Sequence, residues 1–272
     1  MTTATFGHRA AAPGRSGYGF RTVARMEWQK FRTIRSTWYM VAAVAASMIG
    51  LAVLVLSHEN YAHLSAADRA AFDPVHDSFI SLVLVQLLAG ILGVVAITAE
   101  FSSGMIRATF AAVPRRPLVL AAKAAVLGGV TLVAGEISAF AAYAAGQAVL
   151  TAPAPHATLG QPGVLRAVLM AGAYPALSAL IALGLATMIR HTAGAICAVV
   201  GVLFVLPFLA VPLGPSILNT VQNFLPHVMA NSMTAVRPLA HMWSPWLSFA
   251  LLCGYAVAAL AAGSWALTSR DA

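Results

Sequence analysis

The stretch Phe79–Ala99, FISLVLVQLLAGILGVVAITA, holds 21 residues without one charged side chain. An α-helix rises 1.5 Å per residue, so this run is long enough to cross the hydrocarbon core of a bilayer, about 30 Å thick. The whole chain of 272 residues is 60% hydrophobic and 9% charged, whereas soluble domains carry roughly 25% charged residues. The composition excludes a soluble enzyme. Five further runs of the same character cover Trp38–Ser57, Leu118–Leu150, Val168–Ile189, Ala193–Pro212 and Trp246–Thr268.

The predicted fold is therefore an all-α polytopic membrane protein with six transmembrane helices. Residues 19–272 are expected to form a single transmembrane domain, preceded by a disordered tail over residues 1–18 that is rich in Ala, Gly and Thr. The first apolar run begins too far into the chain for a signal peptide. The two cysteines, Cys197 and Cys253, fall inside predicted spans and are interpreted as packing residues.

The formal charge of +8 is unevenly distributed between alternate loops. Lys and Arg mark the cytoplasmic loops of membrane proteins, so this pattern predicts a multi-pass membrane protein with both termini in the cytoplasm. The charge is accounted for by membrane orientation, and no nucleic-acid partner is expected. The loops predicted to face outward hold only Arg69, Arg166 and Arg237. The bases predicted to face the cytoplasm are Arg9, Arg15, Arg21, Arg25, Lys30, Arg32, Arg35, Arg107, Arg115, Arg116, Lys123, Arg190 and Arg270.

Residues 20–38 are predicted to form one amphipathic helix before the first span. The pattern is typical of a helix lying on the inner leaflet; the alternative is a solvated basic flank that only sets topology. Glu27 interrupts the apolar face and needs a partner, for which Lys30 is the nearest candidate. The apolar face holds Phe20, Val23, Ala24, Trp28, Phe31, Ile34 and Trp38, and the polar face Arg21, Arg25, Gln29 and Arg32.

The segment after the second span predicts a short helix capped by Ser102 or Ser103 and ended by Pro114 and Pro117. Phe101, Met105, Ala108 and Ala112 would share one side of it. Such a helix is suited to a groove on a cytoplasmic partner; the alternative is an ordinary connecting loop.

Two motifs resemble those of the type 2 ABC transporter permease family. Glu27-Trp28-Gln29-Lys30-Phe31-Arg32 resembles its E-x-x-K-x-R opening. The segment from Ile97 to Arg107, ITAEFSSGMIR, resembles its I-x-x-E-[YF]-x-x-G-x-[IL]-R stretch, and Pro114-Arg115-Arg116 and Lys123 also match. Together these motifs cover about a fifth of the chain and say nothing of the substrate.

The resemblance implies an assembly of two permease chains, identical or paralogous, with two copies of an ABC ATPase subunit. It implies short re-entrant helices within residues 213–245. It also implies a connecting helix bearing Glu27, Trp28, Lys30 and Arg32, and a coupling helix bearing Glu100, Phe101, Gly104, Met105 and Arg107.

The sequence contains no G-x-x-x-x-G-K-[ST] phosphate loop, so ATP and Mg are expected on a separate subunit, and no cofactor or metal is expected on this chain. The expected function is that of an exporter permease that moves a substrate outward by alternating access. The alternative is a non-transporting membrane protein, such as a sensor or an assembly factor. Drug, lipid, peptide and polymer substrates are not distinguished.

Three charged residues and two stripes of small residues complete the candidates. Glu100 and Arg107 lie two helical turns apart, too far to pair, so Glu100 is expected to meet Lys30 or Arg32 of the connecting helix and Arg107 the ATPase. Glu136 lies beyond the membrane midplane, and is interpreted either as a substrate-path or proton-linked residue or as a carboxyl held by neighbouring polar groups such as Ser138 or Tyr143. The stripes Ala42, Ala46, Gly50 and Gly194, Ala198, Gly201 predict close helix approach across a dimer or within one chain.

Overall fold

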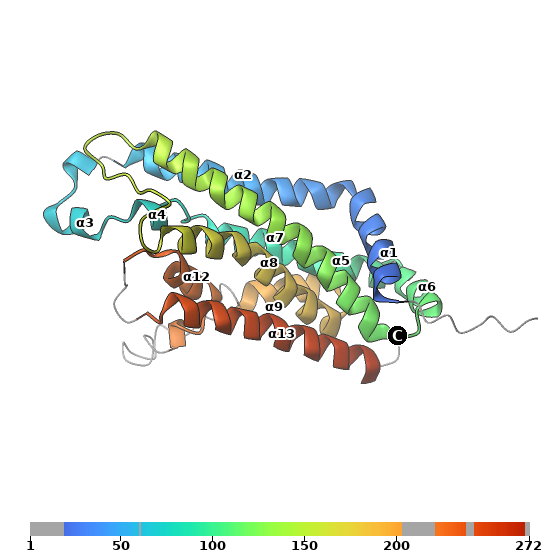
Figure 1. Ribbon diagram of the computed structural model, residues 1–272. Helices are drawn as coiled ribbons and strands as arrows, with labels where there is room; N and C mark the ends of the chain where they lie inside the picture. The colour runs from blue at the N-terminus through green and yellow to red at the C-terminus, as the bar shows by residue number, and fades with distance from the viewer. Residues whose placement is uncertain (1–18, 60, 203–220, 238–241, 270–272) are drawn as a thin grey trace, which may run out of the picture.

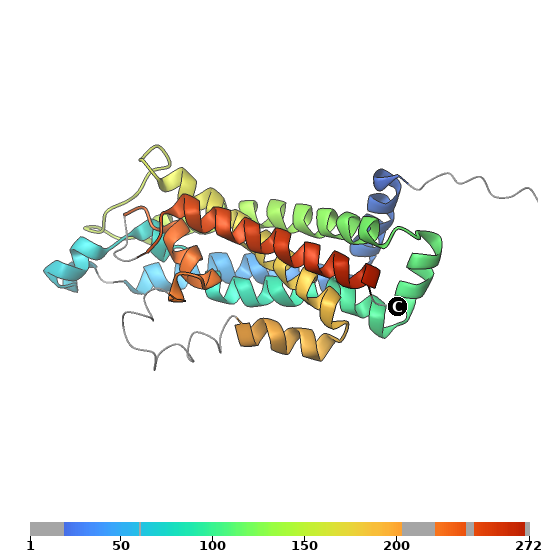
Figure 2. The ribbon, with the colours of Figure 1, turned by 90° about the horizontal axis from the view of Figure 1, so that it is seen from below.

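The computed structural model describes residues 19–59, 61–202, 221–237 and 242–269, and within these ranges it holds helices and no strands. Five helical segments are long and apolar enough to cross a membrane. They run side by side along the molecule in both ribbon views (Figures 1 and 2). The chain is therefore an all-α multi-pass membrane protein. The spans are α2 (Arg35–His58), α4 with α5 (Pro74–Asp77 and Leu82–Ser102), α7 (Arg116–Val149), α8 (Val164–Ile189) and α13 (Pro245–Ser269).

The sixth predicted span, residues 193–212, is described only in its first part. Helix α9 (Thr192–Val200) begins where that span was expected. Residues 203–220 lie outside the described ranges, as do the predicted tail at residues 1–18 and the start of the predicted re-entrant segment. Five candidate spans are thus found where the sequence placed them, and the sixth stays a prediction.

Apart from α9, which lies along the bundle, the short elements gather at its two ends (Figures 1 and 2). One end, called the α6 end below, carries α1 (Phe20–Thr33), α6 (Met105–Ala112) and the last turn of α13. The other, called the α12 end, carries η1 (Tyr61–His63), α3 (Ala66–Ala71), α4 and α12 (Pro226–Thr234). The short helix α12 falls inside the segment for which short helices were expected.

Helix α1 is shorter than predicted. It ends at Thr33, Ile34 adopts an extended conformation with φ −87° and ψ 106°, and α2 begins at Arg35. The bend turns α1 across the end of the bundle (Figure 1). Trp38 packs edge-on against Phe31 at 5.9 Å, so an aromatic contact holds the bend. The prediction of one continuous helix over residues 20–38 was wrong.

Helix α8 lies at the centre of the bundle and packs on α5, α7 and α13. Close approach depends on glycines at these crossings. A Cβ atom on Gly93 of α5 would lie 2.2 Å from the carbonyl oxygen of Ala179, and one on Gly184 of α8 would lie 2.4 Å from that of Ala259. Lipid supplies no hydrophobic driving force between helices, so small residues that allow tight van der Waals packing have this role.

Side-chain hydrogen bonds fasten both ends of the bundle. At the α6 end, the guanidinium groups of Arg116 and Arg190 donate to carbonyl oxygens in the last turn of α13, at 2.8 and 3.0 Å, which suits the negative end of a helix dipole. At the α12 end, Arg166 donates to the carbonyl oxygens of Met233 and Ala235 at 2.9 and 2.7 Å. Asp73 caps α4 and also accepts from the backbone N–H of residue 236 at 2.9 Å.

Candidate functional site

Helix α1 packs against α7 and has one buried stripe of three residues. Val23, Glu27 and Phe31 follow one another at intervals of four, so they share one face, and all three are buried. Phe20 and Trp28 are 47% and 40% exposed. The apolar face predicted from the sequence is therefore divided: part of it is buried against the protein, and the aromatic residues Phe20 and Trp28 are exposed.

Glu27 stands in the buried stripe because Lys123 of α7 lies opposite. The Lys123 Nζ atom is 2.5 Å from Glu27 Oε2 and 2.6 Å from Glu100 Oε1, which comes from the last turn of α5. All three residues are 6% exposed or less. A buried ammonium group between two buried carboxylates is thus paired on both sides.

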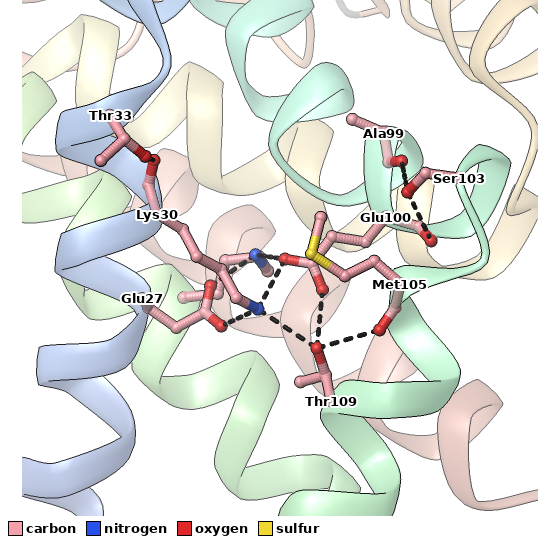
Figure 3. A network of polar contacts seen from close by, with 9 residues as sticks. Glu27, Lys30, Thr33, Ala99, Glu100, Ser103, Met105 and Thr109 are labelled. Atoms are coloured by element: carbon pink, nitrogen blue, oxygen red, sulfur yellow. Dashed lines mark hydrogen bonds and ion pairs between the residues drawn. The ribbon is translucent and has the colours of Figure 1, made fainter.

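Lys30 closes the arrangement from the solvent side. Its Nζ atom donates to Glu27 Oε1 at 2.9 Å, to Glu100 Oε1 at 3.1 Å and to the Thr109 hydroxyl of α6 at 3.2 Å. Figure 3 shows these side chains converging from α1, α5 and α6. Burial alone would lower the pKa of Lys30, but the hydrogen bonds and negative charges of Glu27 and Glu100 raise it above its ordinary value.

Glu27, Lys30, Glu100 and Lys123 form a closed ring of alternating charges, called the charge ring below. Each lysine contacts both glutamates, so the two positive and two negative charges cancel. The ring contains both lysines of the chain. Lysine suits the position because its compact ammonium carries three donors, whereas the planar arginine fork favours one bidentate partner.

The sequence predicted part of this ring. The pairings of Glu27 with Lys30 and of Glu100 with Lys30 are confirmed. Lys123 was missed as their partner, although an isolated base within an apolar helix is a signal of internal pairing. Arg32, the other candidate partner of Glu100, has an exposed side chain outside the ring.

Helix α6 follows α5 through a tight turn at Gly104. Gly104 has φ +71°, a left-handed conformation that glycine adopts without strain. The prediction that Ser102 or Ser103 caps α6 was wrong: both hydroxyls donate back to the carbonyl oxygen of Ala99, at 3.2 and 2.7 Å. Gly104 takes the N-cap position without a side-chain bond.

Helix α6 has one side on the protein and one side open. Ile106 and Thr109 are buried, whereas Met105 is 48% exposed and Arg107 is also exposed. Together with Ala108, Ala111 and Ala112 these form an exposed surface, called the α6 face below. Phe101 is not part of it: its partly buried ring lies 5.6 Å from the Arg190 guanidinium carbon, a cation–π contact within the chain.

Glu136 lies far from the charge ring, on α7 against α8. A Cβ atom on Gly172 would come within 2.5 Å of Glu136 Oε2, and this oxygen is buried without a hydrogen-bond partner among the described residues. The proposed holders are engaged elsewhere, because Ser138 donates to the Ala134 carbonyl oxygen and Tyr143 to that of Ala157, both at 2.6 Å. The reading in which those two side chains hold the carboxyl was wrong.

The two small-residue stripes lie on different helices. Ala42, Ala46 and Gly50 are exposed on α2, which packs mainly on α7 and α5. Gly194, Ala198 and Gly201 lie on or just after α9, which packs mainly on α5 and α8. The α2 stripe is therefore open to a further helix.

No family model and no curated protein matches the chain.

Proposed function

We propose that this chain is the transmembrane permease subunit of an ATP-binding cassette exporter in a bacterial plasma membrane. The charge ring carries the proposal. It joins α1, α5 and α7, with Thr109 of α6 as a further contact, beside an α6 face that has no partner among the described residues. The ring is built from Glu27, Lys30, Glu100 and Lys123, all of which belong to the motifs that resemble the permease family.

In this proposal the α6 face binds the ATPase subunit. Met105 supplies apolar contact, and Arg107 pairs with a carboxylate on the partner. ATP and Mg are held by that partner, and the closure of two ATPase copies pushes α6. Because the charge ring connects α6 with α1, α5 and α7, the push reorients several spans together and opens the path outward.

The distribution of basic residues supports the orientation. Among the described residues, most bases lie at the α6 end, including Arg21, Arg25, Arg107 and Arg115. The α12 end holds three arginines, Arg69, Arg166 and Arg237. Lys and Arg favour the cytoplasmic side, so the α6 end and both termini face the cytoplasm.

The dimer and Glu136 belong to the same proposal. The exposed stripe at Ala46 meets the stripe at Ala198 of a second chain, which places the path between two permease chains.

Glu136 contributes an ionisable group to the path. Glu136→Gln is then expected to change transport or its pH dependence while the protein stays folded, and unchanged transport at every pH would return Glu136 to a structural role.

The rival function is a non-transporting membrane protein, and isolation of the native complex separates the two. The tagged chain is purified from its own cells in mild detergent, and co-purifying proteins are identified by mass spectrometry. We expect an ATPase with a phosphate loop in stoichiometric amount. Absence of any such ATPase would favour a sensor or an assembly factor.

Variants of the α6 face refine this test. Met105→Asp and Arg107→Glu are expected to remove the ATPase from the complex without changing the yield or melting temperature of the permease. Arg25→Glu, a charge reversal on the exposed side of α1, is the matched control and should retain the ATPase. Loss of the ATPase in all three variants would indicate a general charge effect rather than a docking surface.

A further inference from the structure

A second feature of the bundle is a cavity with a volume of about 460 Å³. It lies between α5, α8, α9 and α13, beside residues 221–226 that lead into α12. Its volume falls within the range of about 300–1,000 Å³ typical of small-molecule sites. Gln86, one turn into α5, places the cavity in the half of the bundle nearer the α12 end.

Gln86 lines this cavity and carries an unpaired donor. Its side chain is 2% exposed, and its Oε1 atom accepts a hydrogen bond from the Tyr174 hydroxyl at 2.6 Å. Its amide nitrogen Nε2 is buried and has no hydrogen-bond partner among the residues that the structure describes. A buried amide without a partner destabilises the protein, so this donor requires a reason to be there.

The rest of the lining restricts what can bind. Apolar side chains such as Val199, Leu225 and Ala258 form most of the wall, and none of the described residues lining the cavity carries a charge. The Tyr255 hydroxyl is engaged with the Phe224 carbonyl oxygen at 3.3 Å. A charged ligand would lose its hydration here without gaining a counterion.

We propose that this cavity binds a neutral, largely apolar small molecule through an acceptor oxygen, such as a carbonyl, that receives a hydrogen bond from Gln86 Nε2. If the chain is the permease proposed above, this is the substrate class. That last step rests on the proposed function, whereas the binding site does not.

Binding of radiolabelled progesterone to the purified permease in nanodiscs tests the site. Progesterone is neutral, rigid and apolar, and its polar atoms are two carbonyl oxygens that accept but do not donate. The hydrocarbon 5α-pregnane has the related ring skeleton without those oxygens and serves as competitor. Empty nanodiscs give the signal from lipid partition, which is subtracted.

We expect saturable binding to the wild type. Gln86→Leu should weaken progesterone binding about 3- to 10-fold, the loss typical of one hydrogen bond, and leave competition by 5α-pregnane unchanged. Ala258→Phe, which narrows the cavity from α13, should weaken both compounds. Gln147→Leu, the same exchange on α7 outside the cavity, should leave binding as in the wild type.

Equal affinity of the wild type and Gln86→Leu for progesterone, or no saturable binding above empty nanodiscs, would overturn the site. Each variant is first checked for a single elution peak and for its melting temperature, so that misfolding is recognised, and Ala258→Phe then tests the cavity independently of Gln86. Because the permease is assayed alone, failure here leaves the ATPase experiment intact, and the absence of an ATPase leaves this binding result intact.

Discussion

Replacing Lys123 by Met should unbalance the charge ring. The side chain of Lys123 is 7% exposed and lies 2.5 and 2.6 Å from two carboxylates. Lys123→Met keeps the length and apolar stem of the side chain but leaves Glu27 and Glu100 with Lys30 as their remaining base in the ring, so one negative charge is buried without compensation.

The cost follows from burial. Removing one partner of a buried ion pair destabilises a protein by about 3–5 kcal/mol, because the remaining charge has lost its water and gains nothing in return. For domains of roughly 150–250 residues, each kcal/mol shifts the melting temperature by about 2–4 °C. Lys123→Met should therefore lower the apparent melting temperature by about 6–20 °C.

A double variant separates charge balance from lost packing. In the double variant Glu27→Gln/Lys123→Met, the ion pair of Lys30 and Glu100 remains and its two charges cancel. Thr109 still contacts both residues. Contacting residues couple by about 0.5–3 kcal/mol, so the double variant should lose clearly less stability than the two single variants added together. Arg107→Met, the same kind of exchange on the exposed α6 face, should melt like the wild type.

The assay is the fraction of detergent-solubilised protein that elutes as a single peak after heating, measured for the wild type and the four variants in one detergent. Since membrane proteins often unfold irreversibly, the midpoints are compared at one heating time. Wild-type melting of Lys123→Met, or strict additivity in the double variant, would refute the coupled ring.

Three further predictions address topology, the turn before α6 and the dimer. In a cysteine-free background, single cysteines at Ala70 on α3 and Ala111 on α6 should react with a membrane-impermeant reagent from opposite sides, and labelling of both from outside would reverse the orientation. Gly104→Ala should lower stability by about 1–2 kcal/mol, the cost of a left-handed conformation for an L-residue, and a melting temperature unchanged by the substitution would contradict the need for glycine in this turn. Cysteines at Ala46 and Ala198 should crosslink two chains, as seen on denaturing gels, whereas crosslinks confined to one chain would count against the dimer.

The spans were predictable because each is a long apolar run with charged or proline-containing ends. Helix α7 was expected at 118–150 and is observed at Arg116–Val149. Local charge spacing also predicted the pairing of Glu27 with Lys30, three residues apart. These features depend on neighbours in sequence, which a single chain displays directly.

The pairing of Lys123 with Glu27 and Glu100 was not predictable in this way, because it depends on which helices are neighbours in space. Lys123 is 96 residues from Glu27, and periodicity along one helix does not reveal which other helix lies opposite. The bend at Ile34 was missed for a related reason: no Gly or Pro marks it, and its aromatic contact between Phe31 and Trp38 forms only after the helix has turned. The Ser102 and Ser103 hydroxyls can either cap the following helix or donate back to a carbonyl oxygen of the preceding one. In the structure both donate back to the end of α5.

The composition of the charge ring bears on how motion would pass through this end of the protein. A buried ion network is a weak source of net stability, and apolar residues of equal volume often serve as well or better. What such a network supplies is a fixed geometry, because any displacement of one charge leaves the others unpaired.

Helix α1 is joined to the bundle by one extended residue, Ile34, and α6 by the turn at Gly104, so the backbone alone would let either helix tilt. With Glu27, Lys30, Glu100 and Lys123 linked in a ring, a tilt of α1 that leaves α5 and α7 in place separates at least one of these pairs. In the proposed exporter, a push on α6 therefore favours joint movement of α1, α5 and α7 over sliding of α6 alone, and this is the property that coupling to an ATPase requires.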